Sequence, residues 1–194
     1  MLAKNQLLAA IAPVNRGLKA TELEKQAILA AIATLEDLNP NPHPLEALDL
    51  LDGDWRLIYT TSRELLNLER LPFSHLGQIY QCIRTKSNSV YNIAEIFGLP
   101  YLDGIVTACA RFSPISHRRV EVRFQRSVIG LSRLIGYKSP SQLITDIENG
   151  KKFTALDFTI SANNNPGWLD ITYLDPDLRI GRGNRENVFV LTRA

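Results

Sequence analysis

The spacing of apolar residues changes near Asp54 from the period of a helix to the period of a strand. Upstream, Thr21-Glu22-Leu23-Glu24 has the residues of a capping box, a side-chain and backbone exchange that starts a helix. An apolar stripe at intervals of three and four residues then predicts one helical face. The stripe consists of Leu23, Ala27, Ala31, Leu35 and Leu38. Downstream of Asp54, apolar and polar residues alternate, so we expect a mainly β chain with N-terminal helices, an α+β protein.

Nine segments show the strand pattern, and short connections join most of them. The clearest is 118–128, where Val120, Val122 and Phe124 share one face. The others are 54–61, 77–85, 90–96, 105–112, 153–160, 168–174, 178–182 and 187–193. Short connections imply antiparallel neighbours, which excludes a doubly wound fold. Because antiparallel strands hide their edges by closing, we expect a β-barrel of about 8–9 strands, wide enough for one small ligand.

Length and composition fit one globular unit. A chain of 194 residues with 45% hydrophobic residues can build one sizeable core, and no shift in composition marks a second domain. We therefore expect residues 1–51 to form a helical segment that packs on a barrel of residues 52–194. The net charge of +2 lacks the positive excess of nucleic-acid-binding proteins, so no nucleic-acid partner is expected.

Basic residues gather in one stretch of the C-terminal half. Between residues 111 and 138, six arginines and one lysine face only Glu121 as an opposing charge. This stretch is either a patch that faces anions or a solvated strand face whose acidic neighbours are brought in by folding. The sequence leaves both interpretations open.

Membrane spanning and secretion do not fit the chain. The apolar run 7–14 is shorter than the roughly 20 residues that cross a bilayer, and its spacing suits a surface helix, so any membrane contact should be peripheral. Cys82 and Cys109 have no CxxC partner and fit two small core residues better than a disulfide scaffold. We infer a reducing compartment and a protein that is not secreted.

Motifs for catalysis, metals and cofactors are absent from the sequence. No HExxH, CxxC, GxSxG or phosphate-binding glycine loop occurs, so we expect no metal site, no cofactor and no enzyme activity. Asp170, Asp175 and Asp177 lie near Arg179 and Arg182 in sequence. Acid–base or cation-binding chemistry is one interpretation of this group, and turns stabilised by Asp side chains are the simpler one.

An arginine in the inward phase of a strand suggests a ligand contact. If Val120 and Phe124 point inward, strict alternation places Arg126 inward as well. Its counterion would be a protein carboxylate such as Asp157 or the polar head of a bound amphiphile. Alternatively, a bulge near Ser127 or the exit of the strand at the barrel mouth returns Arg126 to water. The candidate cavity residues are Trp55, Tyr59, Tyr80, Phe124, Arg126 and Tyr173.

The segment 128–138 is strongly apolar but contains two glycines and precedes Ser139-Pro140. A regular strand is weakened by interior glycines. We interpret the segment as an apolar lid or a membrane-contacting stretch, in which two basic side chains would meet anionic head groups. A buried helix that caps the barrel is the alternative. The candidate residues are Ile129, Leu131, Arg133, Leu134, Ile135 and Lys138.

Three sequence blocks resemble the plastid lipid-associated proteins, also called fibrillins or plastoglobulins. They are Leu51-Asp52-Gly53-Asp54-Trp55-Arg56-Leu57-Ile58-Tyr59-Thr60-Thr61-Ser62, Gly77-Gln78-Ile79-Tyr80-Gln81, and the run from Tyr173 to Asn184 leading into Val188-Phe189-Val190-Leu191. This family looks lipocalin-like, and the Gly-x-Trp at Gly53 is similar to the lipocalin signature in which Trp closes the barrel floor beneath a late Arg. Arg193 is the expected stacking partner. The resemblance assigns structural roles to Gly53, Trp55, Asp175, Asp177, Arg179, Arg182, Gly183 and Arg193.

The resemblance implies non-catalytic binding, carriage or sequestration of a hydrophobic small molecule, such as a carotenoid, prenylquinone or fatty acyl lipid. Its expected place is the cytoplasm or the thylakoid-membrane periphery of a photosynthetic bacterium, or a plastoglobule surface in a plastid if the chain is a mature plant form. A structural coat protein with a packed barrel is the alternative. An enzyme acting on lipids or quinones would need polar groups converging around Asp157, Asp170 or Asp175.

Overall fold

The computed structural model describes residues 2–67, 74–161 and 166–194. Within these ranges, helices form the N-terminal part and most of the following chain is strand. The helices are α1 (Leu2–Ile11), η1 (Ala12–Val14), α2 (Glu22–Glu36), η2 (Pro44–Glu46), α3 (Leu48–Leu51), α4 (Arg63–Leu66), η4 (Thr85–Ser87), α5 (Ser132–Ile135), α6 (Pro140–Glu148) and η5 (Asn184–Glu186). The strands are β1 (Gly53–Thr60), β2 (His75–Arg84), β3 (Ser89–Phe97), β4 (Gly104–Pro114), β5 (Arg119–Leu131), β6 (Leu156–Thr159), β7 (Gly167–Leu174), β8 (Leu178–Gly183) and β9 (Val188–Arg193).

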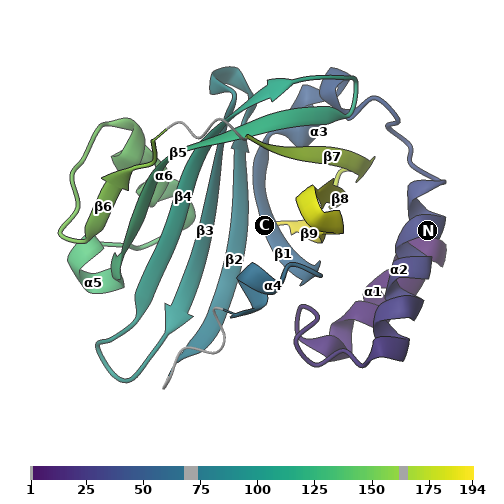
Figure 1. Cartoon of the computed structure of the whole chain (residues 1–194), viewed down its shortest axis with the longest axis horizontal. Coiled ribbons are helices and arrows are strands. Elements are labelled where there is room, and N and C mark those ends of the chain that lie inside the picture. The colour runs from purple at the N-terminus through teal and green to yellow at the C-terminus, as the bar shows by residue number, and fades with distance from the viewer. Residues whose placement is uncertain (1, 68–73, 162–165) are drawn as a thin grey trace.

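The nine strands of the described ranges form one antiparallel sheet in the order β4-β3-β2-β1-β9-β8-β7-β5-β6. Because β4 also pairs with β5, eight of these strands form a closed ring of neighbours, with β6 added to the outside of the order. Figure 1 shows β2 to β5 as long strands on one side of the ring and β7 to β9 crossing the other side. The predicted α+β class, the antiparallel pairing and the barrel-like closure are confirmed.

Four irregularities in strand register bend the ring. Pairing shifts between Leu57 and Tyr59 of β1, in β2 after Leu76, in β7 after Ile171, and where Phe124 and Arg126 of β5 face β4. A β-bulge adds one residue to one strand, which increases local twist and moves the following side chains to the opposite face. Each bulge therefore changes which residues face the interior.

Buried apolar residues form one cluster inside the ring and two on its outer surface. The interior cluster includes Trp55, Leu57 and Phe112. The first outer cluster lies between α1, α2 and strands β1, β7, β8 and β9, and the second lies between α5, α6 and strands β2 to β5. Figure 1 shows these helix pairs on opposite sides of the ring. Both faces of many strands are therefore buried.

The second helix starts as expected but buries a different face. Thr21 and Glu24 form the predicted capping box. The buried residues of α2 are Ile28, Ile32 and Leu35, whereas Leu23 is 80% exposed and Leu38 63% exposed. The predicted stripe is thus right at Leu35 and wrong at Leu23 and Leu38, because the larger isoleucines, also spaced by four residues, occupy the contact with the sheet. None of the helices in the described ranges is long and apolar enough to cross a membrane.

The glycine-containing segment 128–138 is part strand and part helix. Its first residues extend β5 between β4 and β6, and Ser132–Ile135 forms the short helix α5. Gly130 lies so close to Ala155 that an added Cβ would come within 2.8 Å of the Ala155 Cβ, and Gly136 ends α5 with a φ of +76°. The glycines therefore serve close packing and a helix end, and the expectation of a lid over the barrel is corrected.

Candidate functional site

The ring of strands encloses a cavity of about 550 Å³. Its volume lies within the range of sites for small molecules, roughly 300–1,000 Å³. Most of the wall is apolar, and residues from all eight strands of the ring contribute to it. Apolar wall residues include Leu51, Leu57, Ile79, Ile83, Val90, Phe112, Val120, Val122, Leu169, Ile171, Phe189 and Leu191. The arrangement suits a molecule that is mainly hydrocarbon.

Three polar side chains in the cavity wall form a chain of hydrogen bonds. The Nη2 of Arg179 donates to the Oε1 of Gln81, and the Nε2 of Gln81 donates to the Oδ1 of Asn92 over 2.9 Å. All three residues line the cavity, from β8, β2 and β3. We call them the Arg179 cluster. They place connected polar groups at one location of a mainly apolar wall, whose other polar side chains include Ser62, Glu64, Asn184 and Asn187.

Within the described ranges, Arg179 is a buried cation without a carboxylate partner. It is 1% exposed, and its Nε–H has no hydrogen-bond partner. None of the ion pairs among the described residues includes it. Burial, together with the nearby Arg193 guanidinium, lowers the pKa of Arg179 to about 9, so the side chain remains cationic at neutral pH. An uncompensated buried charge is costly, and a buried group in a cavity with a strongly shifted pKa is a candidate functional residue.

Trp55, Arg193 and Gly53 close the end of the ring near Arg179. The Cζ of Arg193 lies 4.2 Å from the centroid of the Trp55 ring, as the resemblance led us to expect, and the Cζ of Arg179 lies 5.3 Å from it. The three side-chain nitrogens of Arg193 donate to the backbone carbonyls of Pro176, Asp52 and Leu50. Arg193 is thus fully engaged in structure.

Exposed wall residues mark the open side of the cavity. Glu64 of α4, Phe124 of β5 and Asn184 of η5 line it and are all exposed, with Phe124 43% exposed. Arg179 and Gly183 both line the cavity and are four residues apart on β8, which corresponds to about 13 Å along a strand. The Arg179 cluster therefore lies at the inner end of a channel that opens near Asn184.

The structure brings only some of the predicted cavity residues to the cavity. Phe124 lines it, and Trp55 belongs to the interior cluster at its closed end. Tyr80 borders the cavity, but its partly buried side chain packs against the second outer cluster. Tyr59 and Tyr173 are buried in the first outer cluster, because the bulges in β1 and β7 shift them to the outer face. The tyrosines therefore do not form a shared polar lining.

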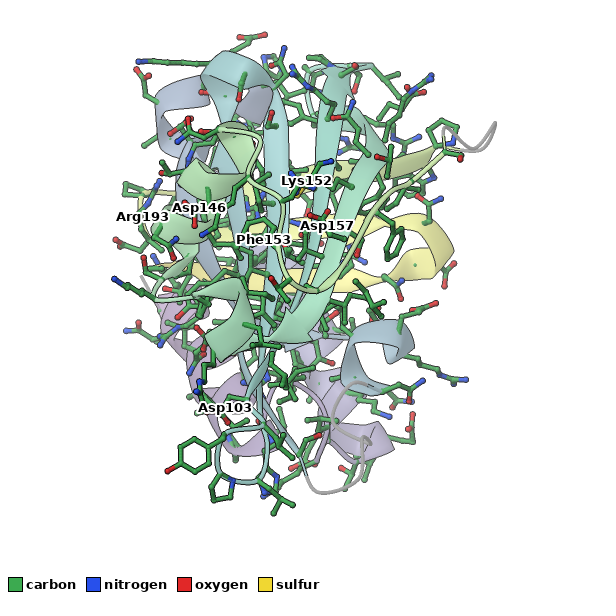
Figure 2. All side chains as sticks on the ribbon, turned by 90° about the vertical axis from the view of Figure 1, so that its left-hand side faces the viewer. Asp103, Asp146, Lys152, Phe153, Asp157 and Arg193 are labelled. Atoms are coloured by element: carbon green, nitrogen blue, oxygen red, sulfur yellow. The ribbon has the colours of Figure 1, made fainter. Side chains whose placement is uncertain are left out.

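Strict alternation fails at Arg126, and its predicted inward position is wrong. Phe124 pairs with Ala110 of the interior cluster, but Arg126 pairs with Cys109 of the second outer cluster, because a bulge at Gln125 separates them. On the outer face, Arg126 makes two hydrogen bonds of 2.8 and 2.7 Å to the Asp157 carboxylate. Figure 2 shows Asp157 beside Phe153 on this face. The bulge and the protein carboxylate are the two alternatives that the sequence left open.

Two other basic residues of the stretch 111–138 are also paired with carboxylates. Arg119 makes a two-point contact with Asp170, and Arg123 pairs with Glu121. These contacts favour the solvated strand face, with acidic partners brought in by folding, over an anion-facing patch. Arg133, Leu134 and Lys138 are exposed, Ile129 and Leu131 are half-buried, and Ile135 is buried in the second outer cluster.

The acidic residues considered for catalysis do not converge on the cavity. Asp157 and Asp170 pair with arginines on the outer face, and Asp175 accepts hydrogen bonds from Lys4 and Tyr173. Hydrogen bonds from their arginine partners hold the pKa values of Asp157 and Asp170 below the usual range. Among the described residues, no group of three His, Cys, Asp or Glu side chains is placed to hold a metal ion.

The other motif residues make contacts within the fold. Arg182 makes a two-point contact with Glu36 of α2, Asp177 offers its carbonyl to the Arg193 N–H, and Gly183 lies in the cavity wall. Arg179, for which a structural role was expected, contacts Gln81 and the Trp55 ring and also lies in the cavity wall as a charged group. Alternation in the sequence places Arg179 on the face opposite Leu178 and Ile180, but only the structure shows that these two residues face the first outer cluster, which turns Arg179 toward the cavity.

Comparison with known proteins gives a consistent group of relatives. The family model described as PAP_fibrillin matches residues 1–192. A light-induced chloroplastic protein of Solanum tuberosum is 35% identical, over 99% of this chain and 67% of its own length. Plastid lipid-associated protein 1 of Brassica campestris is 33% identical, over 98% of this chain and 66% of its own length. A chromoplast-specific carotenoid-associated protein of Cucumis sativus is 32% identical, over 98% of this chain and 67% of its own length. No solved structure matches the chain.

Proposed function

The chain belongs to the PAP_fibrillin family, and from this premise we propose that it binds a hydrophobic small molecule inside the ring of strands without chemical turnover. The observation that carries the proposal is the apolar cavity of about 550 Å³. A carotenoid, a prenylquinone and a fatty acyl lipid are the candidate classes of ligand. The names of the relatives, which include lipid-associated and carotenoid-associated proteins, support this choice.

Filling the cavity tests this proposal. Ala108 lines the cavity from β4, so Ala108→Trp places a large ring in the space that the ligand would occupy. We expect organic extracts of the protein from a photosynthetic host to contain a stoichiometric lipid, quinone or carotenoid by mass spectrometry, and extracts of the variant to lack it. The matched control is Leu156→Trp, at a position that is 68% exposed. Equal ligand content in the two variants would contradict the proposal.

We also propose that the protein docks at the periphery of a photosynthetic membrane or lipid globule through the turn between β3 and β4. Four large side chains of this hairpin surface are exposed: Phe97 51%, Leu99 53%, Tyr101 79% and Leu102 53%. The turn contacts the start of α5, where the Ser132 N–H donates to the Asp103 carbonyl, and the adjacent Leu134 is 55% exposed. Such an apolar group suits insertion at a lipid surface.

Vesicle flotation tests docking separately from ligand binding. We expect the double variant Tyr101→Ser with Leu102→Ser to lose flotation with vesicles of phosphatidylcholine and phosphatidylglycerol. Ile115→Ser is the matched control, because Ile115 is 59% exposed in the turn after the opposite end of β4. Unchanged flotation of the double variant would contradict the hairpin surface. Flotation with no cavity ligand in any preparation would favour the structural coat alternative.

A further inference from the structure

We infer that Arg179 binds the carboxylate of a long-chain monocarboxylic acid whose hydrocarbon chain fills the cavity. This inference rests on the proposed function and names the class of its ligand. It starts from a buried guanidinium that lines the cavity and has an Nε–H without a hydrogen-bond partner. A guanidinium binds carboxylates and phosphates through paired, charge-assisted hydrogen bonds.

The charge of the site matches one negative charge. Arg179 is 1% exposed and has no acidic partner among the described residues. Arg193 is a second cation close enough to act on Arg179, but its side-chain nitrogens already donate to three backbone carbonyls. One available guanidinium neutralises a carboxylate, whereas a phosphate monoester with a charge near −2 would remain uncompensated in an apolar cavity.

Gln81 and Asn92 hold the guanidinium in position. The Oε1 of Gln81 accepts from the Nη2 of Arg179, and the Gln81 Nε2 donates to Asn92. This chain of amides fixes one edge of the guanidinium and adds no negative charge. Gln81 and Asn92 are therefore positioning residues, and Arg179 is the ligand-binding residue.

The shape of the cavity gives the ligand a direction. Arg179 lies near the closed end, beside Trp55, and the wall beyond it along β8 leads to Gly183 and the exposed Asn184. The carboxylate would lie at this inner end, with the hydrocarbon chain extending past Ile171 and Val122 toward Phe124. Apolar wall residues along this path contact the chain, whereas a neutral carotenoid would leave the guanidinium unpaired.

Competitive binding of palmitate and methyl palmitate tests the inference. Displacement of the neutral fluorophore N-phenyl-1-naphthylamine reports occupancy of the cavity for both ligands. We expect palmitate to bind roughly 10- to 100-fold more tightly than its methyl ester, because only the acid makes charge-assisted hydrogen bonds. Arg179→Met should remove this preference and retain ester binding, which also reports that the variant is folded. Arg126→Met, on the outer face, should leave the preference unchanged.

The possible results separate the two proposals. Equal affinity of the wild-type protein for acid and ester would overturn the role of Arg179 and leave the proposed function intact. Persistence of the preference in Arg179→Met would overturn it as well. Failure of both ligands to displace the fluorophore from the wild-type protein would overturn the long-chain acid as ligand, and failure of the fluorophore itself to bind would contradict the proposed function.

Carbon-13 NMR of [1-¹³C]palmitate bound to the wild-type protein gives an independent result that does not require a variant. A guanidinium contact lowers the pKa of a carboxyl group, whereas an apolar cavity without such a contact raises it. We expect the bound carboxyl signal to remain that of the ionised form below about pH 4, near the pKa of an ordinary carboxyl group. A titration above that pH would overturn the contact with Arg179.

Discussion

Gly53 combines two steric requirements in a single residue at the closed end of the ring. Its φ is +125°, and an added Cβ would lie 2.6 Å from the Nη1 of Arg193, the guanidinium that packs on Trp55. We expect Gly53→Ala to lower the free energy of unfolding by about 2 kcal/mol or more, since strain and displacement of Arg193 add. Urea unfolding followed by fluorescence measures the change.

Gly150 is the matched control for Gly53. Its φ is +74°, but no atom lies within 4 Å of an added Cβ, so Gly150→Ala measures strain alone. In a protein that already carries Arg193→Met, Gly53→Ala should lower the free energy of unfolding by less than it does in the wild-type protein, because the two residues share one contact. If Gly53→Ala costs no more than Gly150→Ala, the close approach to Arg193 does not limit this position.

Substitution of Arg126 tests the position of the bulge in β5, because it should change the stability of the protein and leave ligand affinity unchanged. Arg126→Met leaves Asp157 without its two-point partner, in a pair whose side chains are 22% and 14% exposed. We expect a loss of about 1–3 kcal/mol in the free energy of unfolding by urea titration. Ligand affinity should not change, because the side chain lies outside the cavity; a specific loss of affinity in a stable variant would contradict that placement.

Arg126 and Arg179 show what alternation in a sequence can and cannot predict. The same rule that failed for Arg126 holds for Arg179, since β8 pairs with β9 without a register shift from Leu178 to Arg182. A bulge arises from the pairing of two strands distant in sequence, so the residues 118–128 alone do not reveal it. The strand pattern, Trp55 and Arg193 could be predicted, whereas the charged residue of the cavity was assigned to structure.

At the scale of elements, Asp175 connects α1 to the turn between β7 and β8. Its carboxylate accepts hydrogen bonds from Lys4 of α1, from the Tyr173 hydroxyl and from the N–H groups of Asp177 and Leu178. Burial alone would raise the pKa of Asp175, but these hydrogen bonds leave it below the usual value. The turn predicted from the Asp residues is therefore also an attachment point for the N-terminal helices.

This attachment makes stability depend on pH in a defined direction. Because the folded pKa of Asp175 is lowered, its contribution is present above the unfolded value of about 3.9 and is lost as the pH falls below it. We expect Asp175→Asn to cost about 1–3 kcal/mol at pH 7 and progressively less toward pH 3, by thermal unfolding. Asp177→Asn, whose side chain is 78% exposed, is the control and should change little. A cost of Asp175→Asn that stays constant with pH would contradict the role of the charge.

The boundaries of the strands could be predicted from the sequence better than the packing of the helices on the outer faces of the ring. The sequence patterns gave most strands to within a few residues, but the isoleucine face of α2 and the position of α5 and α6 on the sheet depend on strands that are distant in sequence. Gly130 illustrates the difficulty, because a larger residue at this position would collide with Ala155, which is distant in sequence. A glycine in an apolar segment is therefore as compatible with close packing as with a mobile lid.

For the whole molecule, a hollow interior and an unpaired buried guanidinium both lower the stability of the ligand-free protein. An unpaired buried charge costs several kcal/mol, and its replacement by an apolar side chain is often neutral or stabilising. We therefore expect ligand-free Arg179→Met to unfold at the same temperature as the wild-type protein or at a higher one. Arg182→Met should instead lower it, because that change removes the two-point cationic partner of Glu36 and leaves it the Thr172 hydroxyl as a donor.

The same reasoning predicts how the melting temperature responds to a ligand. A ligand that binds only the folded protein, at 100 times its Kd, adds about 2.7 kcal/mol of stability, which corresponds to roughly 5–10 °C for a chain of this size. Differential scanning calorimetry with palmitate should give this shift for the wild-type protein and a smaller one for Arg179→Met at equal palmitate concentration. Methyl palmitate should shift both proteins equally. A ligand-free Arg179→Met protein that melts well below the wild type would instead mean that the guanidinium stabilises the fold and that its charge is compensated without a ligand.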